Sequence, residues 1–271
     1  MELKDKTVLI TGSTDGVGRL VAQRLGAGGA RLLVHGRDAT RGQAAVAEIE
    51  AAGGKAELLV ADLSSLVEVR RLAEAVRART DQLDILVNNA GIGTAGTKRQ
   101  VSADGYELRF AVNYLAGFLL TSELLPLLKA SAPARIVNVA SAGQQAIDFD
   151  DVMLTRNYDG VCAYSQSKLA QIMFTIDLAQ ELKGTNVTVN SLHPASYMNT
   201  TMVRQAGITP WSSVETGADA ILNLATSPAL EGRSGLYFDG QREAYDAKAR
   251  QQLLTLSLDL VGRQSAPLTS R

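Results

Sequence analysis

Short apolar runs alternate with amphipathic stretches along almost the whole chain. The apolar runs have the length and residue types of buried β-strands, and they cover residues 7–10, 31–35, 56–60, 83–87, 135–139, 188–192 and 236–238. The stretches between and after them have helical periodicity over residues 19–25, 40–52, 65–80, 102–128, 163–183, 214–226 and 244–262. Because strands that are apolar throughout are covered on both faces, the chain predicts a Rossmann-type α/β fold. We expect a doubly wound, mostly parallel seven-stranded sheet with helices on both faces.

Two stretches carry neither pattern. Residues 143–161 follow the fifth predicted strand and residues 195–213 follow the sixth, so we expect a substrate-side insert and a flap at that edge of the sheet. Residues 263–271 are expected to form a frayed tail. No repeat or change in composition divides the chain, so residues 1–271 are predicted to form a single domain.

Composition removes several classes of function. The 271 residues are 46% hydrophobic and 20% charged, and the net charge of −1 gives no reason to expect nucleic acid or an anionic membrane as a partner. One cysteine, Cys162, and two distant histidines give no disulfide and no expected metal site. We find no apolar run of membrane-spanning length and no signal-peptide pattern, so a cytoplasmic location is expected.

A glycine-rich turn follows the first predicted strand and precedes a helix. Glycine allows tight turns and close approach to a ligand, and the amides at a helix N-terminus bind phosphate groups. An ordinary turn is the alternative, but at the start of a strand–helix–strand unit this pattern favours a dinucleotide. The residues predicted to contact it are Gly12, Ser13, Thr14, Asp15, Gly16, Val17 and Gly18.

The end of the second predicted strand bears on the choice of dinucleotide. Folds that prefer NAD place an acidic residue there, which binds the ribose 2′-hydroxyl. This chain has Gly36 and Arg37, and an arginine beside a glycine suits a 2′-phosphate. NADP (NADPH) is therefore favoured, with NAD as the alternative because Asp38 comes one residue later and Asp15 lies in the glycine loop. Asp38 also suits the N-cap of the next helix.

More polar or small residues stand where later strands end. In a parallel sheet these ends share one edge, at which ligands bind. Asp62 is predicted to lie beside an adenine amino group, with a helix N-cap as the alternative. The further residues predicted to bind the cofactor are Asp62, Leu63, Asn89, Ala90, Gly91, Tyr164, Lys168 and Pro194.

Tyr164 and Lys168 lie four residues apart at the head of a predicted helix, so their side chains share one face. An ammonium near a phenol lowers the phenol's pKa, which suits proton transfer near neutral pH. Asn113 is surrounded by apolar residues in another predicted helix. It is either a hydrogen-bonded core amide or the mark of a kink that aims a backbone group and a water at the site.

These motifs together resemble the short-chain dehydrogenase/reductase family. They are the glycine turn of residues 11–18, Asp62, Asn88-Asn89-Ala90-Gly91, Asn113, Ser141, Tyr164-x-x-x-Lys168 and His193-Pro194. The long interval from Ser141 to Tyr164 is most similar to retinol dehydrogenases, WW-domain oxidoreductases and their bacterial relatives, without their membrane or WW-domain additions. Ala195 departs from the family pattern, which has glycine after the proline.

The resemblance implies a role for each of four catalytic residues. Tyr164 would be the acid in reduction and the base in oxidation, and Lys168 would hold the ribose hydroxyls and lower the pKa of the tyrosine. Ser141 would bind the substrate oxygen, and Asn113 would position a water that connects Lys168 to solvent. The resemblance also implies a homodimer or homotetramer packed through helices 102–128 and 163–183.

The implied function is NAD(P)-dependent interconversion of a carbonyl and an alcohol on a small molecule. Met198, Met202, Ile208 and Trp211 predict a lipophilic or aromatic substrate, since Arg204 is the one candidate there for an anion clamp. Two alternatives are a catalytically silent dinucleotide-binding regulator and an enzyme of this family for small polar substrates. An epimerase or dehydratase is disfavoured by the glycine spacing, and a hydrolase by the lack of a G-x-S-x-G motif.

Overall fold

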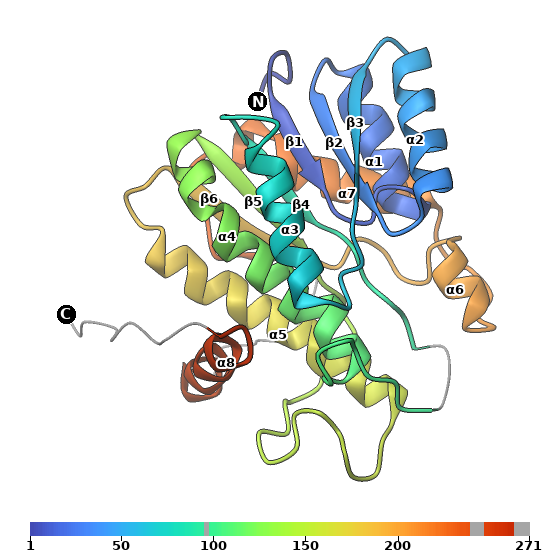
Figure 1. Cartoon of the computed structure of the whole chain (residues 1–271), viewed down its shortest axis with the longest axis vertical. Helices are drawn as coiled ribbons and strands as arrows, with labels where there is room; N and C mark the ends of the chain where they lie inside the picture. The colour runs from blue at the N-terminus through green and yellow to red at the C-terminus, as the bar shows by residue number, and fades with distance from the viewer. Residues whose placement is uncertain (95–97, 239–246, 263–271) are drawn as a thin grey trace.

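A computed structural model describes residues 1–94, 98–238 and 247–262. One sheet of seven parallel strands forms its centre, in the order β3-β2-β1-β4-β5-β6-β7 (Figure 1). The strands are β1 (Thr7–Ile10), β2 (Arg31–Gly36), β3 (Lys55–Val60), β4 (Ile85–Asn88), β5 (Ala134–Val139), β6 (Val187–Leu192) and β7 (Tyr237–Phe238). The predicted fold is confirmed. The strand order reverses between β1 and β4, which is where such sheets open a ligand crevice.

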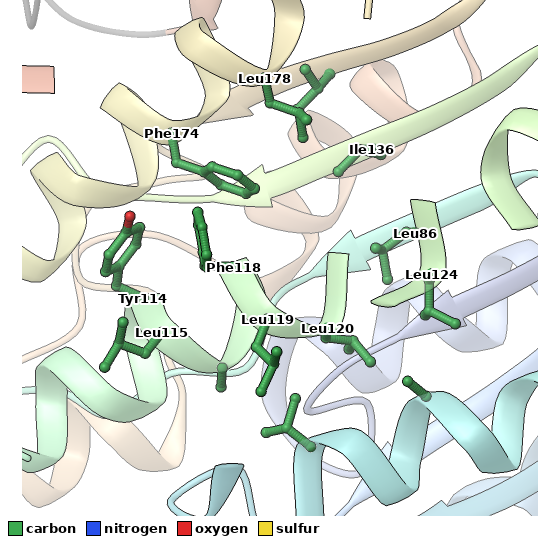
Figure 2. Close-up of a cluster of buried hydrophobic side chains, with 14 of the residues drawn as sticks. Leu86, Tyr114, Leu115, Phe118, Leu119, Leu120, Leu124, Ile136, Phe174 and Leu178 are labelled. Atoms are coloured by element: carbon green, nitrogen blue, oxygen red, sulfur yellow. The ribbon is translucent and has the colours of Figure 1, made fainter. Parts of the chain in front are cut away.

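Helices cover both faces of the sheet (Figure 1). One layer holds α1 (Gly16–Ala27), α2 (Ala39–Ala51) and α7 (Val214–Thr226), and the other holds α3 (Leu66–Arg77), α4 (Ala116–Ala130) and α5 (Gly160–Glu181). Alternate residues of each strand face opposite layers, as Val8 and Leu9 do on β1. In the α4–α5 layer, Phe118 and Phe174 pack with ring centroids 5.0 Å apart (Figure 2).

The predicted helix over residues 102–128 is wrong at its start. Residues 102–107 form a turn, because Gly105 has a φ of 84° and the Ser102 hydroxyl accepts the amide of Tyr106. The buried carboxylate of Glu107 then accepts the Phe110 amide at 2.7 Å. One π-helical turn, η1 (Phe110–Leu115), precedes α4 and contains Asn113, so the helix is irregular at the residue where a kink is expected.

Helices η1 and α4 together form a stretch of 21 residues that is long and apolar enough to cross a membrane. The expectation that no apolar run reaches that length is therefore wrong. Most of this stretch is buried in the protein, between α3 and α5, and that position accounts for its apolar surface.

The last described helix, α8 (Ala247–Leu260), packs along α5 (Figure 1). The Tyr114 hydroxyl is hydrogen-bonded to the Ser257 hydroxyl, and Arg250 forms an ion pair with Asp177 at 3.1 Å. No residue of α5 from 162 to 179 is exposed in the single chain. A homo-oligomer built on the α5 face would therefore contact α8 or displace it. Residues 244–246 and the expected tail 263–271 lie outside the described residues.

The two stretches without periodicity differ from each other. Residues 143–159 contain no helix or strand, as expected. The flap of residues 195–213 holds a short helix, α6 (Thr201–Gln205), which the sequence did not predict. Met198 pairs with Ser212 across the flap, and the rings of Tyr197 and Trp211 lie 4.9 Å apart. These contacts close the flap into a compact unit.

A buried histidine fixes the glycine loop against the sheet. His35 on β2 is 2% exposed, and its Nδ1 accepts the Gly12 amide at 3.1 Å. Its Nε2 therefore carries the ring proton and donates it to the Ala61 carbonyl at 3.2 Å. Burial lowers the pKa of His35 to about 4, against the weaker opposing effects of Ala61 and Asp62. The ring is neutral in the folded protein near pH 7.

This burial predicts a loss of stability in mild acid. Between pH 6.5 and 4 the unfolded chain binds a proton at His35 that the folded protein excludes, so stability falls as the pH falls. The loss is about 3 kcal/mol across this window. Urea unfolding from pH 7 to pH 4 measures it, and His35→Gln, which cannot titrate, is expected to lose less. Equal losses in the two proteins would contradict the prediction.

Candidate active site

The carboxyl ends of β1, β4 and β5 bring the predicted site residues together. A β-carbon added to Gly91 would lie 3.3 Å from Asn113 Oδ1 and 3.5 Å from Lys168 Nζ. One added to Gly143 would lie 3.5 Å from Ser141 Oγ and 3.8 Å from the ring of Tyr164. The four predicted catalytic residues therefore line one edge of the sheet.

The glycine loop is held by the turn that follows β4. The Thr11 hydroxyl accepts the amides of Asn89 and Ala90, each at 3.0 Å, and Asn89 Nδ2 donates to the carbonyls of Thr11 and Gly12. A β-carbon on Gly18 would lie 2.3 Å from Asn89 Nδ2, so no larger residue fits there. Asn89 and Ala90 thus support the loop from the neighbouring strand.

The start of α1 is suited to an anion. Gly12 and Gly16 have φ values of 65° and 54°, a conformation that favours glycine. The Asp15 carboxylate caps the helix through the Gly16 amide. Among the described hydrogen bonds, none uses the amides of Val17 or Gly18, which a phosphate can accept. These residues fit a dinucleotide.

The end of β2 places Arg37 on the surface beside this loop. A β-carbon on Gly36 would lie 2.5 Å from the Thr14 methyl group, so this glycine is needed for the close approach of the loop to β2. Asp38 caps α2 by accepting the Arg41 amide at 3.0 Å, and it pairs with the Arg41 guanidinium at 3.2 Å. The N-cap alternative for Asp38 is confirmed.

The turn after β3 shows that Asp62 is not the N-cap of the next helix, which was the alternative to its predicted role beside the adenine. The cap of α3 is Ser65, whose hydroxyl accepts the Glu68 amide, so Asp62 is not an N-cap. Asp62 is exposed and accepts the Ser64 amide at 2.9 Å. Leu63 is buried in the α3–α4 layer, where it packs as a core residue.

Tyr164 and Ser141 lie together at this edge, since both come within 4 Å of the position that a β-carbon on Gly143 would take. Burial raises the pKa of Tyr164 above its ordinary value, the nearby Ser141 hydroxyl opposes this rise, and Tyr197 adds to it. Ser141 is fixed on both sides, since its Oγ accepts the Gly143 amide at 3.1 Å and its carbonyl accepts the Tyr237 hydroxyl at 2.9 Å. The pair can donate two hydrogen bonds to one substrate oxygen.

Lys168 is buried behind this pair, with its Nζ 5.8 Å from the centre of the Tyr164 ring. The ammonium donates to the Val139 carbonyl and to Gln171 Oε1, both at 2.9 Å. Burial lowers the pKa of Lys168 to about 7. The expectation that Lys168 lowers the pKa of Tyr164 is wrong for this state, because burial of the phenol dominates and the ammonium is directed at other acceptors.

The sequence left two interpretations of Asn113 open, a hydrogen-bonded core amide and an irregular helix that serves the site, and the structure has features of each. It lies in the π-helical turn, and its amide is satisfied within the protein. Its Oδ1 accepts the Ile92 amide at 2.8 Å, and its Nδ2 donates to the Ile92 carbonyl and to Ser167 Oγ. Ser167 in turn donates to the Tyr164 carbonyl at 2.7 Å. Asn113 therefore ties the strand end to the catalytic helix, and its role toward a water stays a prediction.

The flap reaches both the glycine loop and the substrate side. Thr200 lies 3.3 Å from the position that a Gly16 β-carbon would take, and Met202 lies 2.7 Å from that of Gly93. Tyr197 has a φ of 45°, a strained conformation for a tyrosine, and Trp211 is 75% exposed. The flap thus presents aromatic and thioether groups beside the glycine loop.

A buried polar cluster joins the insert to the start of η1. The Tyr158 hydroxyl donates to Glu107 at 3.1 Å, and Arg109 contacts Tyr158 and donates to the Gly93 carbonyl at 2.8 Å. Burial raises the pKa of Tyr158 to about 12. This cluster fixes the insert relative to the loop that Met202 touches.

After β6, His193 hydrogen-bonds through Nε2 to the Ser196 hydroxyl at 3.1 Å, and Pro194 is half-buried at the same edge. Within the described ranges, no group of three or more His, Cys, Asp or Glu side chains could hold a metal.

Sequence reasoning missed several residues that build the site. Thr11, His35 and Tyr237 act through contacts between distant parts of the chain, which no local pattern signals. Gln171 could have been found, because a residue three positions after Lys168 on a helix shares its face.

Comparison with known proteins agrees with this geometry. Residues 6–210 match the short chain dehydrogenase family. Retinol dehydrogenase 14 of Homo sapiens is 38% identical, over 95% of this chain and 86% of its own length. A crystal structure from Mycobacterium Paratuberculosis has a TM-score of 0.80 at 28% identity, covering 97% of this chain and 96% of its own. A Pseudomonas aeruginosa RhlG/NADP complex has a TM-score of 0.71 at 30% identity, covering 88% and 95%. The chain belongs to the short-chain dehydrogenase family and is an NAD(P)-dependent oxidoreductase.

Proposed function

We propose that the chain interconverts a lipophilic or aromatic carbonyl and its alcohol, with NADPH as the preferred dinucleotide. The observation that carries the proposal is the placement of Ser141 and Tyr164 side by side at the sheet edge, with the ammonium of Lys168 behind them. The names of the retinol dehydrogenase relatives and the apolar side chains of the flap support a lipophilic substrate.

The glycine loop, Arg37, Tyr164 and Lys168 would hold the dinucleotide, which supplies the hydride when bound. Ser141 and Tyr164 would donate hydrogen bonds to the carbonyl oxygen and stabilise the charge that develops on it. The raised pKa of Tyr164 keeps its proton in place until that charge appears, and the proton then passes from Oη to the substrate oxygen. Lys168, with a pKa of about 7, is partly charged near neutral pH, and its ammonium would stabilise the phenolate that is left on Tyr164 after the proton has been transferred.

A substrate panel tests the substrate class. Retinal and an aromatic ketone are expected to be reduced faster than a small charged keto sugar, measured as NADPH oxidation. Tyr164→Phe is expected to lower kcat by about 10²–10⁴-fold while NADPH binding, followed by fluorescence, is retained. Preferential turnover of the keto sugar would contradict the lipophilic substrate. NADPH binding without oxidation by any carbonyl would instead favour the silent regulator.

Arg37→Ala tests the choice of dinucleotide. Loss of the guanidinium is expected to weaken NADPH binding by about tenfold and to leave NADH binding nearly unchanged. Arg41→Ala is the matched control, because Arg41 is already paired with Asp38. Titration of both variants with both dinucleotides measures the difference. An NADPH preference that survives Arg37→Ala would overturn the assignment of Arg37.

Two further expectations of the sequence stay predictions: a cytoplasmic location and assembly into a homodimer or homotetramer. The expected oligomer packs through the helices of residues 102–128 and 163–183. In the single chain α8 lies against this part of the protein, so the oligomer would have to contact or displace α8. A mass measurement in solution would decide it.

A further inference from the structure

Among the described hydrogen bonds, Gln171 is the one side chain of α5 that accepts a bond from the Lys168 ammonium. Its Oε1 accepts Nζ at 2.9 Å, and the residue is 4% exposed. A buried ammonium needs acceptors, and the other one here is a main-chain carbonyl, that of Val139. Gln171 is therefore the acceptor that a substitution can remove.

Gln171 also lines a small cavity. Its Nε2 takes part in no hydrogen bond among the described residues. The cavity measures about 10 Å³, and its polar lining comes from Thr11, Asn88, Asn113 and Gln171. This volume is at the lower limit of what one water molecule needs.

Asn88 supplies the opposite side of this cavity with an unused acceptor. Both protons of its Nδ2 are committed, to Thr121 Oγ1 at 2.9 Å and to Asn138 Oδ1 at 2.8 Å, so the orientation of the amide is fixed. Its Oδ1 is buried and has no partner. A buried acceptor without a partner is costly unless a water satisfies it.

We propose that Gln171 is a positioning residue for Lys168, and that one buried water shared with Asn88 satisfies the Gln171 amide nitrogen while the amide oxygen faces the ammonium. The water accepts a hydrogen bond from Gln171 Nε2 and donates one to Asn88 Oδ1. If the amide turned over, Nε2 would face Nζ, and two donors would meet. The ammonium therefore selects the orientation with the Gln171 oxygen toward Nζ, and the water satisfies Nε2 in that orientation.

The Lys168 ammonium has few acceptors around it, so Gln171 Oε1 contributes to keeping it charged. The groups that face Nζ are the Val139 carbonyl from β5, the Gly91 backbone after β4, and Gln171 and the Tyr164 ring from α5. Tyr164 is the titratable group among them, and no carboxylate contacts the ammonium among the described residues. The charged form of Lys168 thus depends on neutral acceptors, of which Gln171 is one.

The first test uses the cofactor-free protein and does not depend on the proposed function. NMR titration of the ¹⁵N-labelled lysine side chains, with Lys168→Arg for assignment, follows the ammonium directly. Gln171→Met, which keeps the shape and removes the acceptor, is expected to lower the pKa of Lys168 by about one unit. Gln171→Glu is expected to raise it. Gln166→Met is the matched control, because Gln166 is a fully buried glutamine of the same helix that donates to Val152 instead.

The second test rests on the proposed function and uses the pH profile of kcat/KM for carbonyl reduction. The alkaline limb is expected to move down by about one pH unit in Gln171→Met and up in Gln171→Glu, while Gln166→Met leaves it in place. A merely structural role for Gln171 would lower activity at all pH values without moving the limb. If no carbonyl is reduced, the proposed function fails, and the NMR titration still decides the role of Gln171.

A high-resolution crystal structure of the cofactor-free protein completes the test. Density for one water within hydrogen-bonding distance of Gln171 Nε2 and Asn88 Oδ1 is expected. An empty cavity would overturn the shared water. A Lys168 titration that is the same in wild type, Gln171→Met and Gln171→Glu would overturn the positioning role.

Discussion

A buried ammonium must be given acceptors in a place where water is scarce, and the arrangement of this site follows from how Lys168 obtains them. The strand end of β5 offers the Val139 carbonyl, and α5 offers Gln171 one turn further along. Gly91 has no side chain to fill the space beside Nζ, so the turn after β4 can approach. Burial then brings the pKa of Lys168 to about 7, where its charge responds to what binds nearby. A lysine in solution would stay charged far above that pH and could not respond in this way.

Other polar side chains connect the site to the sheet. Asn113 interrupts the regular helix with a π-helical turn and binds the backbone of Ile92, which follows β4. His35 and Thr11 hold the glycine loop from β2 and β1. Each of these side chains joins two segments that are distant in sequence. The crevice is therefore rigid at its base, and the flap and the insert above it are where substrate choice can differ.

Much of this could be predicted from the sequence, because local patterns determine it. The apolar strands, the glycine loop and the Tyr164–Lys168 spacing are signals of short range, and they predict a mostly parallel sheet and its ligand edge. Effects that depend on burial or on distant contacts were not predictable. The pKa of Tyr164 rises because the phenol is buried, although a nearby ammonium alone would lower it. Contacts between distant segments likewise determine how α8 covers α5 and how His35 acts. One glycine conformation, that of Gly105, determines the helix start near residue 108.

The central claim is that this edge transfers a hydride to a carbonyl carbon and a proton from Tyr164 to its oxygen. Incubation with NADPH deuterated at the transferring C4 position and a lipophilic aldehyde such as retinal, followed by mass spectrometry of the alcohol, tests it most directly. One deuterium on the carbinol carbon of the product, lost when Tyr164 is replaced by Phe, is the predicted result. An alcohol without deuterium, or undiminished transfer in Tyr164→Phe, would contradict it.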